Sequence, residues 1–130
     1  MTYNELSSTV LEVAIDVHRR LGPGLLEAVY QTILAHELTK RGFHVVKEQP
    51  IPLIWDNLRF DIGFRADLIV NDLLLVELKS VEQLAPVHKK QVLTYLRITG
   101  KKLGLLINFG EEILKDGIRR IINGSLDEPG

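Results

Sequence analysis

Two carboxylates and a lysine lie in the most apolar stretch of the chain. Asp67, Glu77 and Lys79 fall within residues 64–80, FRADLIVNDLLLVELKS, where short hydrophobic runs are joined by a polar pair. Burial of a charge is costly unless the charge is paired or bound to a metal ion. Carboxylate oxygens are ligands that suit Mg²⁺ or Mn²⁺. The pattern therefore predicts a divalent-cation site, with a structural cluster of ion pairs as the alternative.

The length of the turn decides whether the two carboxylates can share a cation. A two-residue loop would place Asp67 and Glu77 on opposite faces of the hairpin, because side chains alternate along a strand. A three-residue loop, residues 71–73, pairs Val70 with Leu74 and brings the carboxylates opposite each other. We therefore predict an odd-length loop or a bulge.

Composition is that of an ordinary globular domain. The chain has 130 residues, 45% of them hydrophobic and 25% charged, with a formal net charge of -1. It has no cysteine, which excludes disulfides, thiolate metal sites and cysteine nucleophiles. We predict one domain over residues 1–124, a frayed tail over residues 125–130, no membrane segment and a cytoplasmic location.

Positive charge is concentrated in one segment. From Lys79 to Lys102 there are six basic residues, Lys89 and Lys90 among them, against one acid, Glu82. Such a segment could face a polyanion. A solvated helix face is an equally good interpretation.

Helical periodicity and end signals define three helices. The first runs from a Thr2–Glu5 capping box to Leu21, and the second runs from about Leu25 to the glycine at position 42. The third begins at Pro86 and ends before Gly100.

The remaining apolar segments predict strands. They lie at residues 43–46, 51–55 and 58–62, in the two halves of the hairpin, at 103–109 and at 118–122. The last of these segments also fits a helix, although Asp116-Gly117 favours a turn between short strands. We expect Trp55 to pack in the core or at a sheet edge rather than to form a base-stacking platform. The order ααβββαβ, with a possible extra C-terminal strand, predicts an α/β fold with a mixed sheet flanked by helices.

Three motifs carry a resemblance to a known group. Asp67, followed after ten residues by Glu77-Leu78-Lys79, resembles the PD-(D/E)XK nuclease superfamily, although Ala66 replaces the usual proline. Residues 24–30, GLLEAVY, resemble the motif of its GxxExxY family, and Gln91-x-x-x-Tyr95 is similar to its QxxxY element. The resemblance implies a restriction-endonuclease-like core.

The resemblance also implies roles for individual residues. Asp67 and Glu77 would bind Mg²⁺ or Mn²⁺, with the Leu78 carbonyl as a further ligand. Lys79 would position or deprotonate the attacking water, and Gln91 would lie beside the catalytic centre. Glu27 is implied as a direct or water-mediated ligand, although a carboxylate there also stabilises a helix N-terminus.

Other candidates have structural alternatives. Tyr30 could contact substrate or pack in the core. Gln91 and Tyr95 have a polar helix face as their alternative. His88 shares a helix face with Gln91 and Tyr95. His18 lies at a helix C-terminus and is as well explained as a capping or core residue.

These features predict a metal-dependent nuclease that hydrolyses nucleic acid, expected to be DNA, by attack of water. The alternatives are a non-catalytic binding module with the same fold and an accessory subunit of a larger enzyme. A homodimer is plausible because cleavage of both strands needs two sites. The sequence shows no interface.

Overall fold

The computed structural model describes residues 1–126, and residues 127–130 of the predicted tail lie outside the described residues. Its elements are α1 (Tyr3–Leu21), α2 (Glu27–Lys40), β1 (Val45–Trp55), β2 (Leu58–Val70), β3 (Leu74–Lys79), α3 (Pro86–Thr99), β4 (Leu103–Asn108), a short 3₁₀ helix (Leu114–Gly117) and β5 (Ile118–Ile122). The predicted α/β order is confirmed, including the extra C-terminal strand.

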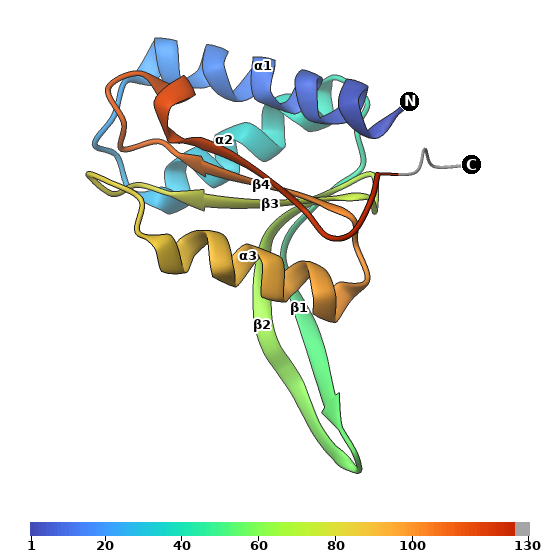
Figure 1. Ribbon diagram of the computed structural model, residues 1–130. Helices are drawn as coiled ribbons and strands as arrows, with labels where there is room; N and C mark the ends of the chain where they lie inside the picture. The colour runs from blue at the N-terminus through green and yellow to red at the C-terminus, as the bar shows by residue number, and fades with distance from the viewer. Residues whose placement is uncertain (127–130) are drawn as a thin grey trace.

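The five strands form one mixed sheet in the order β1-β2-β3-β4-β5. Only the β3–β4 pair is parallel, and α3 makes the crossover between these two strands. Helices α1 and α2 lie on one face of the sheet and α3 lies on the other (Figure 1). The central strands are therefore covered on both faces, which explains their nearly continuous hydrophobic sequences.

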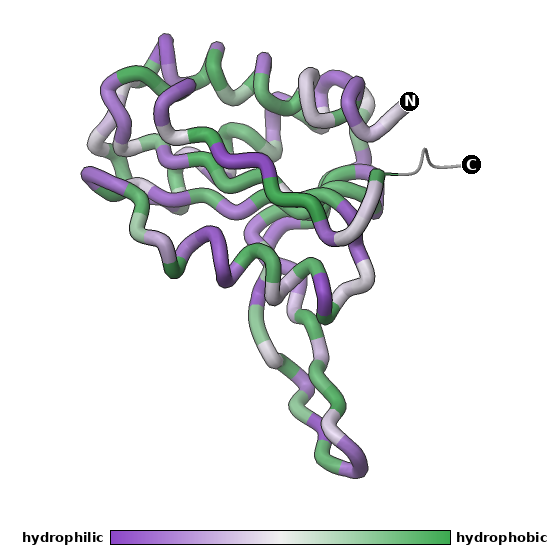
Figure 2. The backbone as a smooth tube through the Cα atoms, viewed as in Figure 1, coloured by the Kyte–Doolittle hydropathy of each residue, from purple (hydrophilic) through white to green (hydrophobic). Residues whose placement is uncertain are grey.

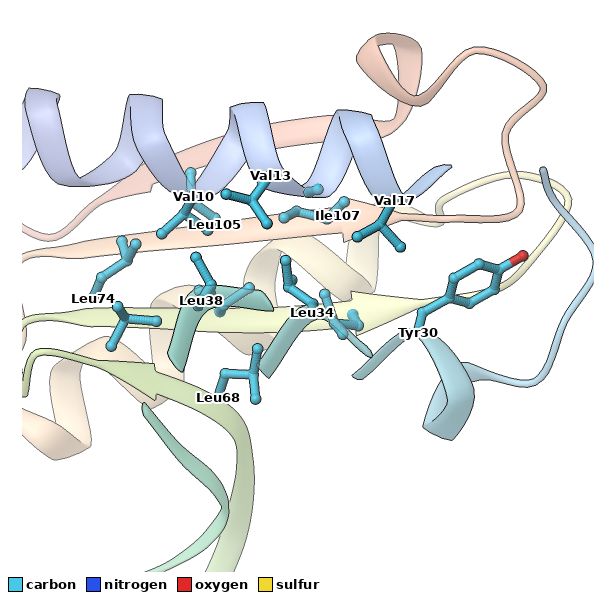
Figure 3. Packing of buried hydrophobic residues seen from close by; sticks show 14 of the residues in the cluster. Val10, Val13, Val17, Tyr30, Leu34, Leu38, Leu68, Leu74, Leu105 and Ile107 are labelled. Carbon is cyan, nitrogen blue, oxygen red and sulfur yellow. The ribbon is translucent and has the colours of Figure 1, made fainter. Parts of the chain in front are cut away.

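Each face of the sheet has its own core. Valines of α1 and leucines of α2 pack against β3 and β4 on one face, as Figure 3 shows. On the other face, Val92 and Leu96 of α3 pack against Leu75 and Leu106. Because Leu75 and Glu77 are two residues apart on β3, Glu77 points toward the α3 side.

The predicted helix ends are largely confirmed. Thr2 and Glu5 form a reciprocal capping box, and Gly100 ends α3 in the left-handed conformation with φ 71°. Helix α2 begins at Glu27, slightly later than expected, with Leu26 in an extended conformation.

The first two strands are longer than the sequence predicted. The strand segments expected at 43–46 and 51–55 are one strand, β1, that continues through Pro50. Proline is tolerated there because β1 is the edge of the sheet. The outer parts of β1 and β2 project beyond α3 as a two-stranded arm (Figure 1). Trp55 lies at its tip and is 69% exposed, so the prediction that it packs in the core or at an edge is wrong.

No helix within the described residues is both long and apolar enough to cross a bilayer.

Candidate functional site

The hairpin has the register that the shared site requires. Val70 pairs with Leu74 around a three-residue loop, and Leu68 pairs with Val76. Continued by one residue, this register places Asp67 opposite Glu77. The loop forms because Asn71 and Asp72 both adopt positive φ, 53° and 56°, which these residue types tolerate well. The predicted odd-length loop is confirmed.

The two carboxyl groups are tied to each other's strand. The Leu78 amide donates to Asp67 Oδ2 at 2.8 Å, and the Asp67 amide donates to Glu77 Oε1 at 3.3 Å. Each side chain thus uses one oxygen to satisfy a backbone amide across the hairpin. The pair is held rigidly face to face.

Glu77 lies in an environment that opposes its charge. Its relative exposure is 7%. Burial, followed by the charge of Asp67, raises the pKa of Glu77 to about 9, and Lys79 lowers it only in part. At neutral pH in the absence of a cation, Glu77 therefore carries a proton. A bound cation would replace that proton between the two carboxylates.

Lys79 and Glu27 extend this site from two different elements. Lys79 ends β3, two residues beyond Glu77 and on the same face, and is half-buried. Burial raises the pKa of the Glu27 carboxyl, the charge of Lys79 lowers it, and that of Asp67 raises it. Glu27, at the first position of α2, is therefore within electrostatic reach of Lys79 and Asp67.

Tyr30 fixes the loop that carries Glu27. Its hydroxyl donates to the Gly22 carbonyl at 2.6 Å and accepts from the Leu25 amide at 3.1 Å. Its ring stacks on Phe109, with centroids 4.5 Å apart, and the side chain is fully buried at the edge of the core (Figure 3). Tyr30 is thus unavailable to substrate, and the expectation of a substrate contact is corrected to a positioning role.

A cavity of about 540 Å³ opens beside Glu27. Its lining joins the loop before α2 to the residues that follow Lys79, including Ser80 and Val81. Ser80 Oγ donates to the Leu25 carbonyl at 2.6 Å and so ties these two walls together. Space for a ligand therefore adjoins the charged residues.

Two buried polar residues hydrogen-bond to the backbone of the site, and the sequence did not predict this role for either of them. Gln31 is buried, and its Nε2 donates to the Asp67 carbonyl at 2.9 Å. Asn108 is also buried. Its side chain accepts from the amides of Val81 and Gly110 and donates to the Val81 carbonyl. The one available signal was a polar residue inside an apolar helix or strand pattern.

Helix α3 brings Tyr95 to the carboxylate pair. Its ring stacks on Phe64 of β2, with centroids 3.8 Å apart and planes 6° apart. Burial raises the pKa of the Tyr95 hydroxyl, and the charges of Glu77 and Asp67 raise it further. Gln91 lies one turn earlier on the same helix and is exposed.

The two candidate histidines have structural partners. His88 Nδ1 accepts from the Ala85 amide at 3.0 Å and so caps α3. His18 is buried, with Nε2 2.7 Å from the Glu111 carbonyl oxygen. The expectation that either contacts substrate gives way to the capping and core alternatives. Lys89 and Lys90 are exposed on the first turns of α3.

The donor set suits a hard divalent cation that keeps several water ligands. Asp67 and Glu77 supply opposed carboxylates, and all candidate donors are oxygens. Within residues 1–126, no three Asp, Glu, His or Cys side chains converge as one ligand set.

The chain belongs to the PD-(D/E)XK nuclease superfamily, whose family profile matches residues 4–121. The match spans α1 to β5 and so includes every residue of the site. No curated protein and no solved structure matches the chain.

Proposed function

We propose that the protein is a Mg²⁺- or Mn²⁺-dependent nuclease of the GxxExxY branch, with DNA as its substrate. The observation that carries the proposal is the opposition of Asp67 and Glu77, with Lys79 on the same face. Membership of the superfamily supports this chemistry. A buried carboxylate with a strongly raised pKa beside another acid is typical of functional sites.

The roles of the residues follow from their positions. Asp67 and Glu77 would hold the cation, which would supply Lewis-acid stabilisation and lower the pKa of a nearby water. The Leu78 carbonyl would be a further ligand, and Glu27 would hold a water molecule beside the site. Lys79 directs the attacking water and stabilises the negative charge that develops on the phosphate. Gln91, with Lys89 and Lys90, contacts the substrate backbone from α3.

Cleavage assays test the proposal. The purified protein is incubated with Mg²⁺ or Mn²⁺ and single-stranded, double-stranded and branched DNA, with RNA as a comparison. We expect cleavage that chelation abolishes and that Lys79→Ala or Asp67→Asn lowers at least about 100-fold. Lys115→Ala, which removes an exposed lysine from the 3₁₀ helix, is the matched control. Cleavage that survives both site variants would refute the assignment.

One observation favours a second function, a binding module that keeps the fold without cutting. Asp67 and Glu77 each accept a hydrogen bond from a backbone amide across the hairpin, so both carboxyl groups have a protein partner without a cation. Calorimetry with Mn²⁺ separates the two functions. Binding that Asp67→Asn removes supports the nuclease, and the absence of binding supports the module or an accessory subunit.

A further inference from the structure

The β1–β2 arm has one uncovered apolar face. Leu53 pairs with Phe60 and Trp55 pairs with Leu58, so these four side chains share a face of the ribbon. We call these four residues the apolar strip. Trp55, Leu58 and Phe60 are 69%, 59% and 51% exposed. Figure 2 shows hydrophobic residues continuing along the arm beyond the body of the protein.

The opposite face of the arm is different in character. It carries Ile54 paired with Arg59, and Arg59 Nε lies 3.0 Å from Asp61 Oδ1. A two-stranded ribbon is marginally stable in water without further packing. The arm is therefore amphipathic, with a mixed face that carries Ile54, Arg59 and Asp61 and a wholly apolar face formed by the apolar strip.

Helix α3 covers the apolar face of the β1–β2 ribbon only at the base of the arm. Ile51 and Phe64, which pair there, belong to the core beneath α3, and Phe64 stacks on Tyr95. Beyond that point the ribbon runs past α3 (Figure 1). The apolar strip is thus the outward continuation of an established packing surface.

Charge argues against nucleic acid as the occupant. Between residues 53 and 62 the charged side chains are Asp56, Arg59 and Asp61, two acids against one base. The single cation is already paired with Asp61. Binding of a phosphate backbone depends on unpaired Lys and Arg, which this segment lacks. An uncharged strip instead fits an apolar protein surface.

We propose that the apolar strip packs against the same strip of a second copy of this chain. A two-fold interface requires a patch that complements itself. The apolar strip complements itself because two uncharged surfaces can meet without leaving any charge buried and unpaired. Two ribbons stacked face to face, ~10 Å apart, also reproduce ordinary sheet packing. Trp55 is the natural anchor, since tryptophan dominates the centres of interfaces.

The size of the strip sets the strength of this dimer. Large aromatic side chains bury about 150–250 Å² each, so the exposed fractions leave roughly 400 Å² of apolar surface on each arm. The paired strips bury roughly 800 Å² in total, which is below a standard interface and in the range of weak, transient contacts. The dimer is therefore micromolar or weaker and dissociates on dilution.

The dimer also bears on the proposed nuclease. Strand β2 runs from the arm directly to Asp67, so a two-fold contact between arms fixes the spacing of two sites. Only this consequence rests on the proposed function. The assembly is tested without any activity measurement, so failure of one claim is distinguishable from failure of the other.

Sedimentation and fluorescence of the intact chain test the proposal. Trp55 is the sole tryptophan, so its emission reports directly on the strip. Between about 1 µM and about 500 µM protein we expect the mass to double and the emission to move to shorter wavelength, with coincident midpoints. Phe60→Lys should stay monomeric with constant emission, because two lysines would then oppose each other.

Ile54→Lys is the matched control. Ile54 is 61% exposed on the opposite face, so the same kind of change should leave the dimer intact. A wild-type chain that stays monomeric, or equal effects of the two variants, would overturn the proposal. So would an emission shift that appears only on addition of an oligonucleotide. If Phe60→Lys does not fold, the wild-type dilution series still decides.

Discussion

Replacement of Glu77 by glutamine should stabilise the cation-free protein while removing its metal site. Glu77 is buried opposite Asp67, and these surroundings raise its pKa from 4.5 to about 9. The folded chain therefore holds a proton that the unfolded chain releases above about pH 4.5. The free energy of unfolding is highest below that pH and falls as pH rises toward 9, where the folded protein also loses the proton.

The size of the effect follows from the shift. Between the unfolded and the folded pKa, each pH unit lowers the free energy of unfolding by ~1.4 kcal/mol. At pH 7 the free energy of unfolding of the wild-type protein is therefore about 3 kcal/mol lower than it is below pH 4.5. The amide of Glu77→Gln is neutral at every pH and can still donate to Asp67. The variant should therefore be more stable than wild type by about 3 kcal/mol at pH 7 and by more at pH 9.

Urea unfolding at pH 5, 7 and 9 without divalent cations measures this difference. Glu12→Gln, which alters an exposed carboxylate on α1, is the control and should follow the wild type. A wild-type stability that is constant from pH 5 to 9 would refute the reasoning. So would a Glu77→Gln variant that gains nothing at pH 9.

Three further predictions follow from the same geometry. Mn²⁺ binding should release a proton from Glu77, so the affinity should rise as pH rises toward 9. Calorimetry in buffers of different ionisation enthalpy measures the released proton. A binding enthalpy that is the same in all buffers would contradict the prediction. Gln31→Leu should cost about 1–3 kcal/mol in urea unfolding and weaken Mn²⁺ binding, because the Asp67 carbonyl loses its partner. Tyr30→Phe keeps the stack on Phe109 but loses both hydroxyl bonds, and should lower stability by about 1–3 kcal/mol.

The helix ends and the hairpin register were predictable because they depend on residues that are close together in the sequence. The Thr2 capping box and Gly100 fixed helix ends because capping involves residues only a few positions apart. The hairpin register was predicted from the requirement that Asp67 and Glu77 share a face. That requirement leaves an odd-length loop or a bulge, and the structure has a three-residue loop.

Features that depend on distant partners were not predictable in the same way. Gln31 reaches Asp67 across 36 positions of sequence, and no short pattern encodes such a contact. Trp55 is of a residue type common in cores, but β1 and β2 continue to pair with each other beyond α3, which crosses only the base of the arm (Figure 1). The hydrophobic pattern predicts which face of the arm is apolar, whereas only the tertiary arrangement shows that this face is uncovered.

A crystal of the protein soaked in Mn²⁺ tests the central claim most directly. The anomalous signal of manganese identifies the ion independently of the protein atoms. The proposed function predicts a peak between the carboxylates of Asp67 and Glu77, with water linking the ion to Glu27. A fully soaked crystal with no peak there, or with manganese bound only elsewhere, would contradict it.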